Sequence, residues 1–222
     1  MLLVLLLLLS LASPARYSPQ APAPQIQRKP APVMDARGAA WLLRPERDEE
    51  EQPEEVLDAL KIRPGDVVAD VGAGVGYFTL RISRRVGETG KVLAVDIQQA
   101  MLDQLIKKRD QAGLQNIETL LGTETDPRLP VNSMDLVLMV DVYHEFSRPV
   151  EMMERIRASL KPTGRLVLVE YRGEDPTVPI RPEHKMTERQ VLDEIIPMGF
   201  RHLQTLGFLS RQHIIIFAKQ NN

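Results

Sequence analysis

Two hydrophobic rhythms alternate through the middle of the chain. Short runs rich in Val and Leu are separated by longer stretches in which apolar residues recur every three or four positions. Near-continuous apolar runs are typical of strands buried on both faces, and strands joined by helices indicate βαβ units. The pattern predicts an α/β fold with a doubly wound, Rossmann-like, mostly parallel sheet and helices on both faces. The expected strands are 67–71, 91–96, 116–121, 135–140 and 165–171, and the expected helices are 75–86, 98–112 and 150–160.

The rhythm changes near the C-terminus. A helix is expected over 187–198, because a Thr-x-x-Gln capping box opens it and Gly199 follows it. The apolar runs 200–208 and 213–218 come next, with too few residues between them for a crossover helix. They are expected to pair as a hairpin, so that the last part of the sheet carries an antiparallel strand.

The first 33 residues differ from the rest of the chain. Residues 1–11 are almost entirely leucine, and small residues and a Pro/Ala/Gln-rich stretch follow them. The apolar run is shorter than the ~20 residues of a membrane span and resembles a secretory signal, although no basic residue precedes it. We therefore divide the chain into a leader and linker, 1–33, and a folded domain, 34–222. The leader predicts export or membrane anchoring, whereas a true start at Met34 would leave the domain in the cytoplasm.

Composition narrows the range of chemistry. The chain of 222 residues contains no cysteine, which excludes thiolate nucleophiles, disulfides and Cys-based zinc sites. Its formal net charge of −2 gives no general attraction to nucleic acid or to an anionic membrane. We therefore expect a small-molecule partner, no nucleic acid, and membrane contact only through an uncleaved leader.

A glycine-rich turn follows the first expected strand. A dinucleotide fingerprint has its third glycine three residues after the second, but here Gly76 comes only two residues after Gly74. Asp70 opens the turn, where it would repel a pyrophosphate but attract an amino group. Asp96 ends the next strand, twenty residues after Gly76, where it can accept the hydroxyls of a ribose. A ligand with an amino group and an unphosphorylated ribose is expected, and S-adenosylmethionine fits that description.

At this point the chain resembles a known family, the class I S-adenosylmethionine-dependent methyltransferases. The resemblance runs from about Glu54 to the C-terminus and includes enzymes that act on ubiquinone and menaquinone precursors. It implies a seven-stranded sheet of order 3-2-1-4-5-7-6 in which strand 7 is antiparallel. The segments that carry it are VVADVGAGVGYFTL, KVLAVDIQQAML, MDLVLMVDVYHEF and LKPTGRLVLVEY.

The resemblance also implies which residues bind the cofactor. Thr123 stands where relatives carry an acidic residue near the adenine, so Glu124 is expected to replace it or a backbone group to serve instead. Asp141 follows the fourth strand at the ligand-binding edge of the sheet. The expected cofactor-binding residues are Asp70, Gly72, Gly74 and Gly76 at the methionine end, Asp96 and Ile97 at the ribose, and also Tyr77, Glu124 and Asp141.

The segment 141–145 carries the densest set of functional side chains. Methyl transfer depends mainly on placing the acceptor against the methyl carbon, and a base is needed only where the acceptor holds a proton. His144 titrates near neutrality and is the expected base; Tyr143 and Glu170 are the other catalytic candidates. The alternatives are a His144 that caps the next helix or is bonded within its loop, and a structural hydrogen bond at Glu170.

Other polar residues carry weaker signals. Three of the four histidines, His144, His184 and His213, could join Glu145 or Glu170 around zinc or iron, but they lack a metal-motif spacing and no metal site is predicted. His184 with Lys185 could instead close over the acceptor.

The segment before the first helix also allows two interpretations. Trp41, with Arg44 and Arg47, is either a lid on the cofactor pocket or a plug on the sheet. The charged run 44–55 is expected to be a solvated lead-in to a helix, with an acidic binding surface as the alternative.

The predicted function is therefore methyl transfer from S-adenosylmethionine to a small, lipophilic metabolite. A non-catalytic module that binds the same cofactor is the alternative. An NAD-dependent oxidoreductase is a third possible function, which the glycine spacing disfavours.

Overall fold

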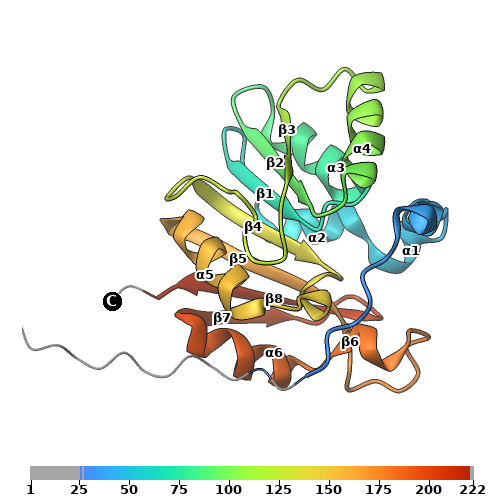
Figure 1. Cartoon of the computed structure of the whole chain (residues 1–222), viewed down its shortest axis with the longest axis vertical. Coiled ribbons are helices and arrows are strands. Elements are labelled where there is room, and N and C mark those ends of the chain that lie inside the picture. Colours follow the sequence, from blue (N-terminus) through green and yellow to red (C-terminus); the bar gives the residue numbers. More distant parts are fainter. Residues whose placement is uncertain (1–25, 27, 221–222) are drawn as a thin grey trace, which may run out of the picture.

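The computed structural model describes residue 26 and residues 28–220 (Figure 1). The predicted signal-like run and its cleavage region lie outside these residues. Within the described part of the chain, every helix is too short or too polar to cross a bilayer.

A single mixed sheet forms the centre of the domain (Figure 1). Its order is β3-β2-β1-β4-β5-β8-β7, and β8 runs antiparallel to both neighbours. The short β6 pairs with the end of β5; without it the order is the predicted 3-2-1-4-5-7-6, which is thereby confirmed. The strands are β1 Val67–Val71, β2 Lys91–Asp96, β3 Ile117–Leu121, β4 Met134–Val140, β5 Leu160–Arg172, β6 Lys185–Met186, β7 Phe200–Leu206 and β8 Gln212–Lys219.

Helices cover both faces of the sheet, as predicted. One buried cluster joins α2, α3 and α4 to the sheet, and a second joins α5 and α6 to its other face. The α-helices are α1 Arg47–Glu51, α2 Pro53–Leu60, α3 Tyr77–Val86, α4 Gln99–Gln111, α5 Pro149–Ser159 and α6 Glu188–Ile195. The 3-10 helices are η1 Ala36–Leu43, η2 Tyr143–Glu145, η3 Pro182–His184 and η4 Ile196–Met198.

Local signals set most element ends. The backbone N–H of Gln190 donates to Thr187 Oγ1 at 3.0 Å and caps α6, and Gly199 in the left-handed region ends η4. β5 begins at Leu160, earlier than the predicted residue 165, because Leu160 pairs with Met134 beyond an irregularity in the ladder. The predicted hairpin is confirmed as β7 and β8.

The predicted domain boundary at Met34 needs correction, because residues 28–33 pack on the domain. The Arg28 guanidinium donates to the carbonyl oxygens of Tyr143 and His144, both at 2.8 Å. The backbone N–H of Ala31 donates to the same His144 carbonyl at 3.0 Å, and Ala31 is buried. The Pro/Ala-rich composition concealed these contacts, since they come from one arginine side chain and from the backbone.

Arg28 is expected to stabilise the fold. Arg28→Ala removes the donor to two carbonyls and to Glu194, whose carboxylate lies 3.1 Å from Arg28 Nε. We expect the free energy of unfolding, measured in urea, to fall by about 1–3 kcal/mol. Lys29→Ala, at an exposed neighbouring position, should leave it unchanged; equal stability of the two variants would contradict the inference.

Candidate functional site

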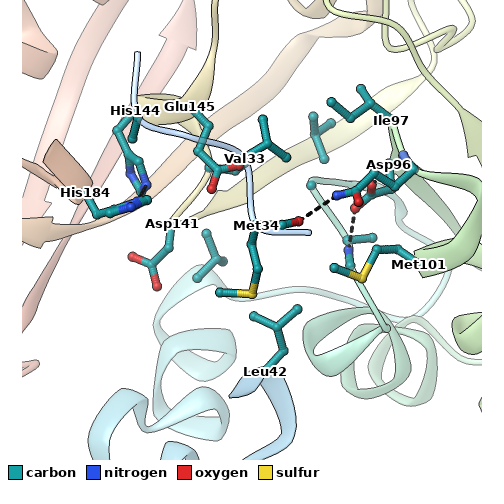
Figure 2. Close-up of a pocket in the computed structure, with 18 of the residues that line it drawn as sticks. Val33, Met34, Leu42, Asp96, Ile97, Met101, Asp141, His144, Glu145 and His184 are labelled. Atoms are coloured by element: carbon teal, nitrogen blue, oxygen red, sulfur yellow. Dashed lines mark hydrogen bonds between the residues drawn. The ribbon is translucent and has the colours of Figure 1, made fainter. Parts of the chain in front are cut away.

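A cavity of about 660 Å³ lies at the carboxyl ends of β1, β2 and β4 (Figure 2). Within the sheet, β1 has β2 as its neighbour on one side and β4 as its neighbour on the other. The order of the strands therefore reverses direction at β1. Open α/β sheets bind ligands at such a switch point, and the volume falls within the ~300–1,000 Å³ typical of ligand pockets. The cavity is therefore the candidate site.

The glycine turn forms one wall of the cavity. Gly72, Gly74 and Gly76 all have positive φ angles, of 80°, 52° and 87°. A Cβ atom on Gly72 would lie 2.5 Å from Val142 Cγ2, and one on Gly76 would lie 2.9 Å from Leu105 Cγ. Both the backbone conformation and the close approach of neighbouring side chains therefore require glycine here.

Asp96 fixes this turn to the end of β2. Its Oδ2 accepts a hydrogen bond from the backbone N–H of Gly74 at 2.9 Å, and its Oδ1 accepts one from Gln98 at 2.9 Å. Burial raises the pKa of Asp96 above its ordinary value, although these N–H donors oppose the shift. Each carboxylate oxygen keeps a lone pair beyond the bond it already makes.

Asp70 lies buried beneath the turn. Its Oδ2 accepts a hydrogen bond from Thr79 Oγ1 at 2.5 Å, and burial raises its pKa to about 6. Arg47 opposes that shift and also lines the cavity. The cavity thus offers an acidic group and a guanidinium together, as a ligand with both an amino group and a carboxylate requires.

The sequence did not single out Arg47 as a binding residue. Arg47 is buried against the ring of Tyr77 at 3.8 Å, and its Nε donates to Glu51 Oε2 at 2.9 Å. Glu51 is buried too, so the interpretation of this charged run as a solvated lead-in is wrong for both residues. The i, i+4 spacing of Arg47 and Glu51 within this acidic run was the only sequence signal that the two side chains pair.

Asp141 carries an unsatisfied buried oxygen. Its Oδ2 accepts from Gln212 Nε2 at 2.8 Å, but its Oδ1 has no hydrogen-bond partner within residues 26 and 28–220. Burial raises the pKa of Asp141 well above its ordinary value, and the nearby Glu51 and Glu170 add to the shift. Figure 2 shows its carboxyl group facing the cavity, where a ligand could supply the missing partner.

A Glu–His–His chain forms the opposite end of the cavity. Glu170, fully buried on β5, accepts the Tyr143 backbone N–H at 2.9 Å and the His144 Nδ1–H at 2.5 Å. The other ring nitrogen, His144 Nε2, lies 3.1 Å from His184 Nδ1. Burial lowers the pKa of His144, but the Glu170 carboxylate outweighs it, so that this pKa lies above its ordinary value.

The geometry supports a structural hydrogen bond at Glu170. It does not support the alternative for His144, because its ring contacts β5 and η3 and neither its own loop nor the next helix. His144 and Glu170 make a buried hydrogen bond within the fold, and His144 also lines the cavity. His184 lies beside His144 and lines the cavity, whereas Lys185 and His213 do not line it.

Tyr143 is not brought to the cavity. Its side chain is fully buried, and its hydroxyl donates to Glu194 Oε2 at 2.9 Å on the far side of η2. Tyr143 contributes to the candidate site only through its backbone N–H, which donates to Glu170. The alternation of side chains around a 3-10 turn, which the sequence did not reveal, turns Tyr143 inward and His144 toward the cavity.

The N-terminal segment covers the cavity. Gln98 Nε2 donates to the Met34 carbonyl at 2.8 Å, and the N–H of Ala36 donates back to Gln98 Oε1 at 3.1 Å. Trp41 lines the cavity under a stacked Arg44 guanidinium, 3.9 Å from the ring centroid. The sequence predicts either a lid on the cofactor pocket or a plug on the sheet for the segment around Trp41. Its position over the cavity corresponds to the lid and not to the plug. The remaining predicted residues, Tyr77, Ile97 and Glu124, also line the cavity.

Comparison with known proteins identifies relatives. A family model described as a methyltransferase domain matches residues 68–164. Ubiquinone/menaquinone biosynthesis C-methyltransferases UbiE from Escherichia fergusonii and Salmonella arizonae are 30% identical over 116 residues. That match covers 52% of this chain and 46% of each relative, so the chain matches about half the length of these curated proteins.

Solved structures extend the likeness to most of the chain. A SAM-dependent methyltransferase from Aquifex aeolicus superposes with a TM-score of 0.79 at 29% identity, covering 83% of this chain and 98% of that one. The [4+2]-cyclase SpnF shares the fold, with a TM-score of 0.67 at 16% identity over 78% of this chain and 82% of its own. Together, the family match and the Aquifex aeolicus relative imply S-adenosylmethionine as the cofactor.

Proposed function

Because the chain belongs to the class I S-adenosylmethionine-dependent methyltransferases, we propose that it transfers a methyl group to a small, lipophilic metabolite. One observation carries the proposal: a single cavity joins the glycine turn and Asp96 at one end to His144 at the other. Cofactor and acceptor would meet between these ends, and proximity of this kind can lower a reaction barrier by ~7–11 kcal/mol.

The residues of the first half fit the cofactor. The turn allows backbone approach at Gly72 and Gly74, and Asp96 has lone pairs left for ribose hydroxyls. Asp70 and Arg47 offer opposite charges for the amino and carboxylate groups, with the unpaired Asp141 oxygen nearby. When bound, S-adenosylmethionine would supply a methyl carbon activated by a sulfonium.

The second half would orient the acceptor. Glu170 holds the His144 ring by Nδ1, so Nε2 is the nitrogen that would act on an acceptor group in place of its contact with His184 Nδ1. Apolar side chains that line the cavity favour a lipophilic molecule, and the names of the UbiE relatives suggest a quinone precursor. The apolar lining includes Val33, Met34, Trp41, Leu42, Val142, Phe146, Pro179 and Ile180.

Labelled cofactor tests the proposal directly. We expect label to pass from methyl-labelled S-adenosylmethionine to a compound of a metabolite extract, and calorimetry to detect S-adenosylhomocysteine binding but no NAD binding. Tight S-adenosylhomocysteine binding without transfer would favour a non-catalytic binding module. Binding of NAD alone would overturn the proposal.

Asp96→Ala should weaken the cofactor complex. It removes the partner of the ribose hydroxyls and frees the Gly74 and Gln98 N–H groups that hold the turn. We expect a loss of about 1–3 kcal/mol in S-adenosylhomocysteine binding by calorimetry, roughly 5- to 150-fold in Kd. Asp103→Ala, on the exposed side of α4, is the control; equal affinities would remove Asp96 from the site.

Cofactor affinity should also depend on pH through Asp70. Its pKa of about 6 means that the free protein holds a proton there below pH 6. Only the carboxylate attracts a cationic amino group, so S-adenosylhomocysteine affinity should fall roughly tenfold from pH 7 to pH 5. The stability of the ligand-free fold should change with pH in the opposite direction. The folded chain holds the Asp70 proton more tightly than the unfolded chain, so the free energy of unfolding should fall as pH rises from about 4 to 6.

Asp70→Asn separates this effect from the other buried carboxyl groups of the cavity. The variant should lose most of the pH dependence measured by calorimetry between pH 5 and 7. An undiminished slope would assign the dependence to Asp96, Asp141 or Glu145, whose pKa values are also raised by burial.

A further inference from the structure

Two histidines in the cavity present nitrogen atoms to one another. His144 Nε2 and His184 Nδ1 lie 3.1 Å apart, and the two rings are perpendicular, with centroids 5.1 Å apart (Figure 2). A Glu145 carboxylate oxygen lies within 4.8 Å of one ring nitrogen of each histidine. These side chains come from η2 and η3, which are far apart in the sequence and adjacent in the fold.

We propose that His144, His184 and Glu145 form a binding site for one divalent transition-metal ion of the zinc type. Imidazole nitrogens bind Zn²⁺ at ~2.0–2.1 Å. Two nitrogens 3.1 Å apart can both reach that distance from one ion, with an angle between them of roughly 100°. Such an angle lies between octahedral and tetrahedral values. The two rings would turn so that both lone pairs point at the ion, and rotation of the Glu145 side chain would complete the set.

Glu170 provides the outer support that metal-binding histidines usually have. It accepts the Nδ1–H of His144, which leaves Nε2 with its lone pair toward His184. Its second oxygen is held by the Tyr143 N–H, so the carboxylate cannot turn away. This carboxylate–histidine arrangement fixes both the orientation and the tautomer of the ring.

The surrounding charge also favours a cation. The carboxyl groups of Asp141, Glu145 and Glu170 lie near His144, whereas one cation, the Arg181 guanidinium, lies near His184. Asp141 has an oxygen without a partner and faces the same part of the cavity (Figure 2). A buried group of carboxylates is costly unless positive charge compensates it, and a divalent ion would do so.

Two His and one Glu leave a coordination position open, as in catalytic zinc sites. That position would face the cavity and take an oxygen atom of the acceptor, such as a phenol. This assignment of an oxygen-bearing acceptor rests on the proposed methyl transfer, whereas the metal site itself does not.

Metal binding alone tests the site. The full chain, freed of metal by a chelator, should bind one Zn²⁺ by calorimetry, and Co²⁺ in its place should give visible absorption bands. His184→Ala should weaken Zn²⁺ binding about 100-fold and remove the Co²⁺ bands. Glu170→Gln should weaken Zn²⁺ binding roughly 10- to 100-fold, because an amide donor facing Nδ1 places the proton on Nε2.

His202→Gln, which removes a histidine outside the cavity, is the matched control and should bind Zn²⁺ like the parent chain. Absence of Zn²⁺ binding by the parent, or equal affinity in His184→Ala, would overturn the site. S-adenosylhomocysteine binding on the same samples separates the proposals: its presence without Zn²⁺ binding overturns the metal site only. Zn²⁺ binding without it supports the metal site and counts against the proposed function.

Discussion

Replacing His144 by alanine is expected to lower the rate of methyl transfer by ~10²–10⁴-fold, the range that a positioned acid–base group contributes. His144 Nε2 is the ring nitrogen that an acceptor would contact in place of His184, since Nδ1 is bonded to Glu170. The alanine variant lacks Nε2, so it loses this nitrogen both as a general base and as a metal ligand. The measurement is the rate of label transfer from methyl-labelled S-adenosylmethionine to a metabolite extract.

Cofactor affinity distinguishes a chemical effect from a general loss of structure. His144→Ala leaves the buried Glu170 without its Nδ1–H partner, which should cost about 1–3 kcal/mol of stability. The glycine turn and Asp96 lie at the other end of the cavity, so the Kd of S-adenosylhomocysteine should stay unchanged. A normal transfer rate would leave His144 with a structural role only, and loss of cofactor binding would point to misfolding.

The order of the sheet could be predicted because its signals are local. Most strands of the parallel part are short apolar runs rich in Val and Leu, and a Thr187 cap and a Gly199 stop mark the last helix. The two-residue β6 had no such signal: it forms only because the chain returns beside the end of β5. Short edge pairings of this kind depend on tertiary position, not on residue pattern.

The cofactor half of the site was more predictable than the acceptor half. Asp70, the glycines and Asp96 stand at the ends of two adjacent strands, so their proximity follows from the parallel topology. The pairing of His144 with His184 depends instead on the path of a long loop after β5. No periodicity fixes such a path, and scattered spacing gave no reason to expect the two rings in contact.

The N-terminal segment shows a different limit. Its composition is typical of a linker, yet Arg28, Ala31 and Met34 bind the domain through backbone carbonyls and N–H groups. Backbone contacts leave little trace in residue type. One consequence is that the cover of the cavity includes residues that composition assigned to the leader.

Gly72→Ala should have the largest effect on stability among the turn substitutions. An alanine at φ 80° is strained by about 1–3 kcal/mol. Its Cβ would also lie 2.5 Å from Val142 Cγ2 and 2.8 Å from Val142 Cβ, an overpacking that typically costs a further ~1–3 kcal/mol. We expect the free energy of unfolding in urea to fall by about 2–6 kcal/mol.

Gly113→Ala is the matched control for this substitution. Gly113 also has a positive φ, of 68°, but nothing lies within 4 Å of the position of its Cβ. Its alanine variant therefore carries the backbone strain without the collision, so the difference between the two variants measures the contact with Val142. Val142 follows Asp141 in the loop after β4 and lines the cavity. The overlap between the added Cβ and Val142 must therefore move either the glycine turn or this loop. S-adenosylhomocysteine affinity should consequently fall in Gly72→Ala and not in Gly113→Ala, and equal losses in both would show that the close approach does not shape the site.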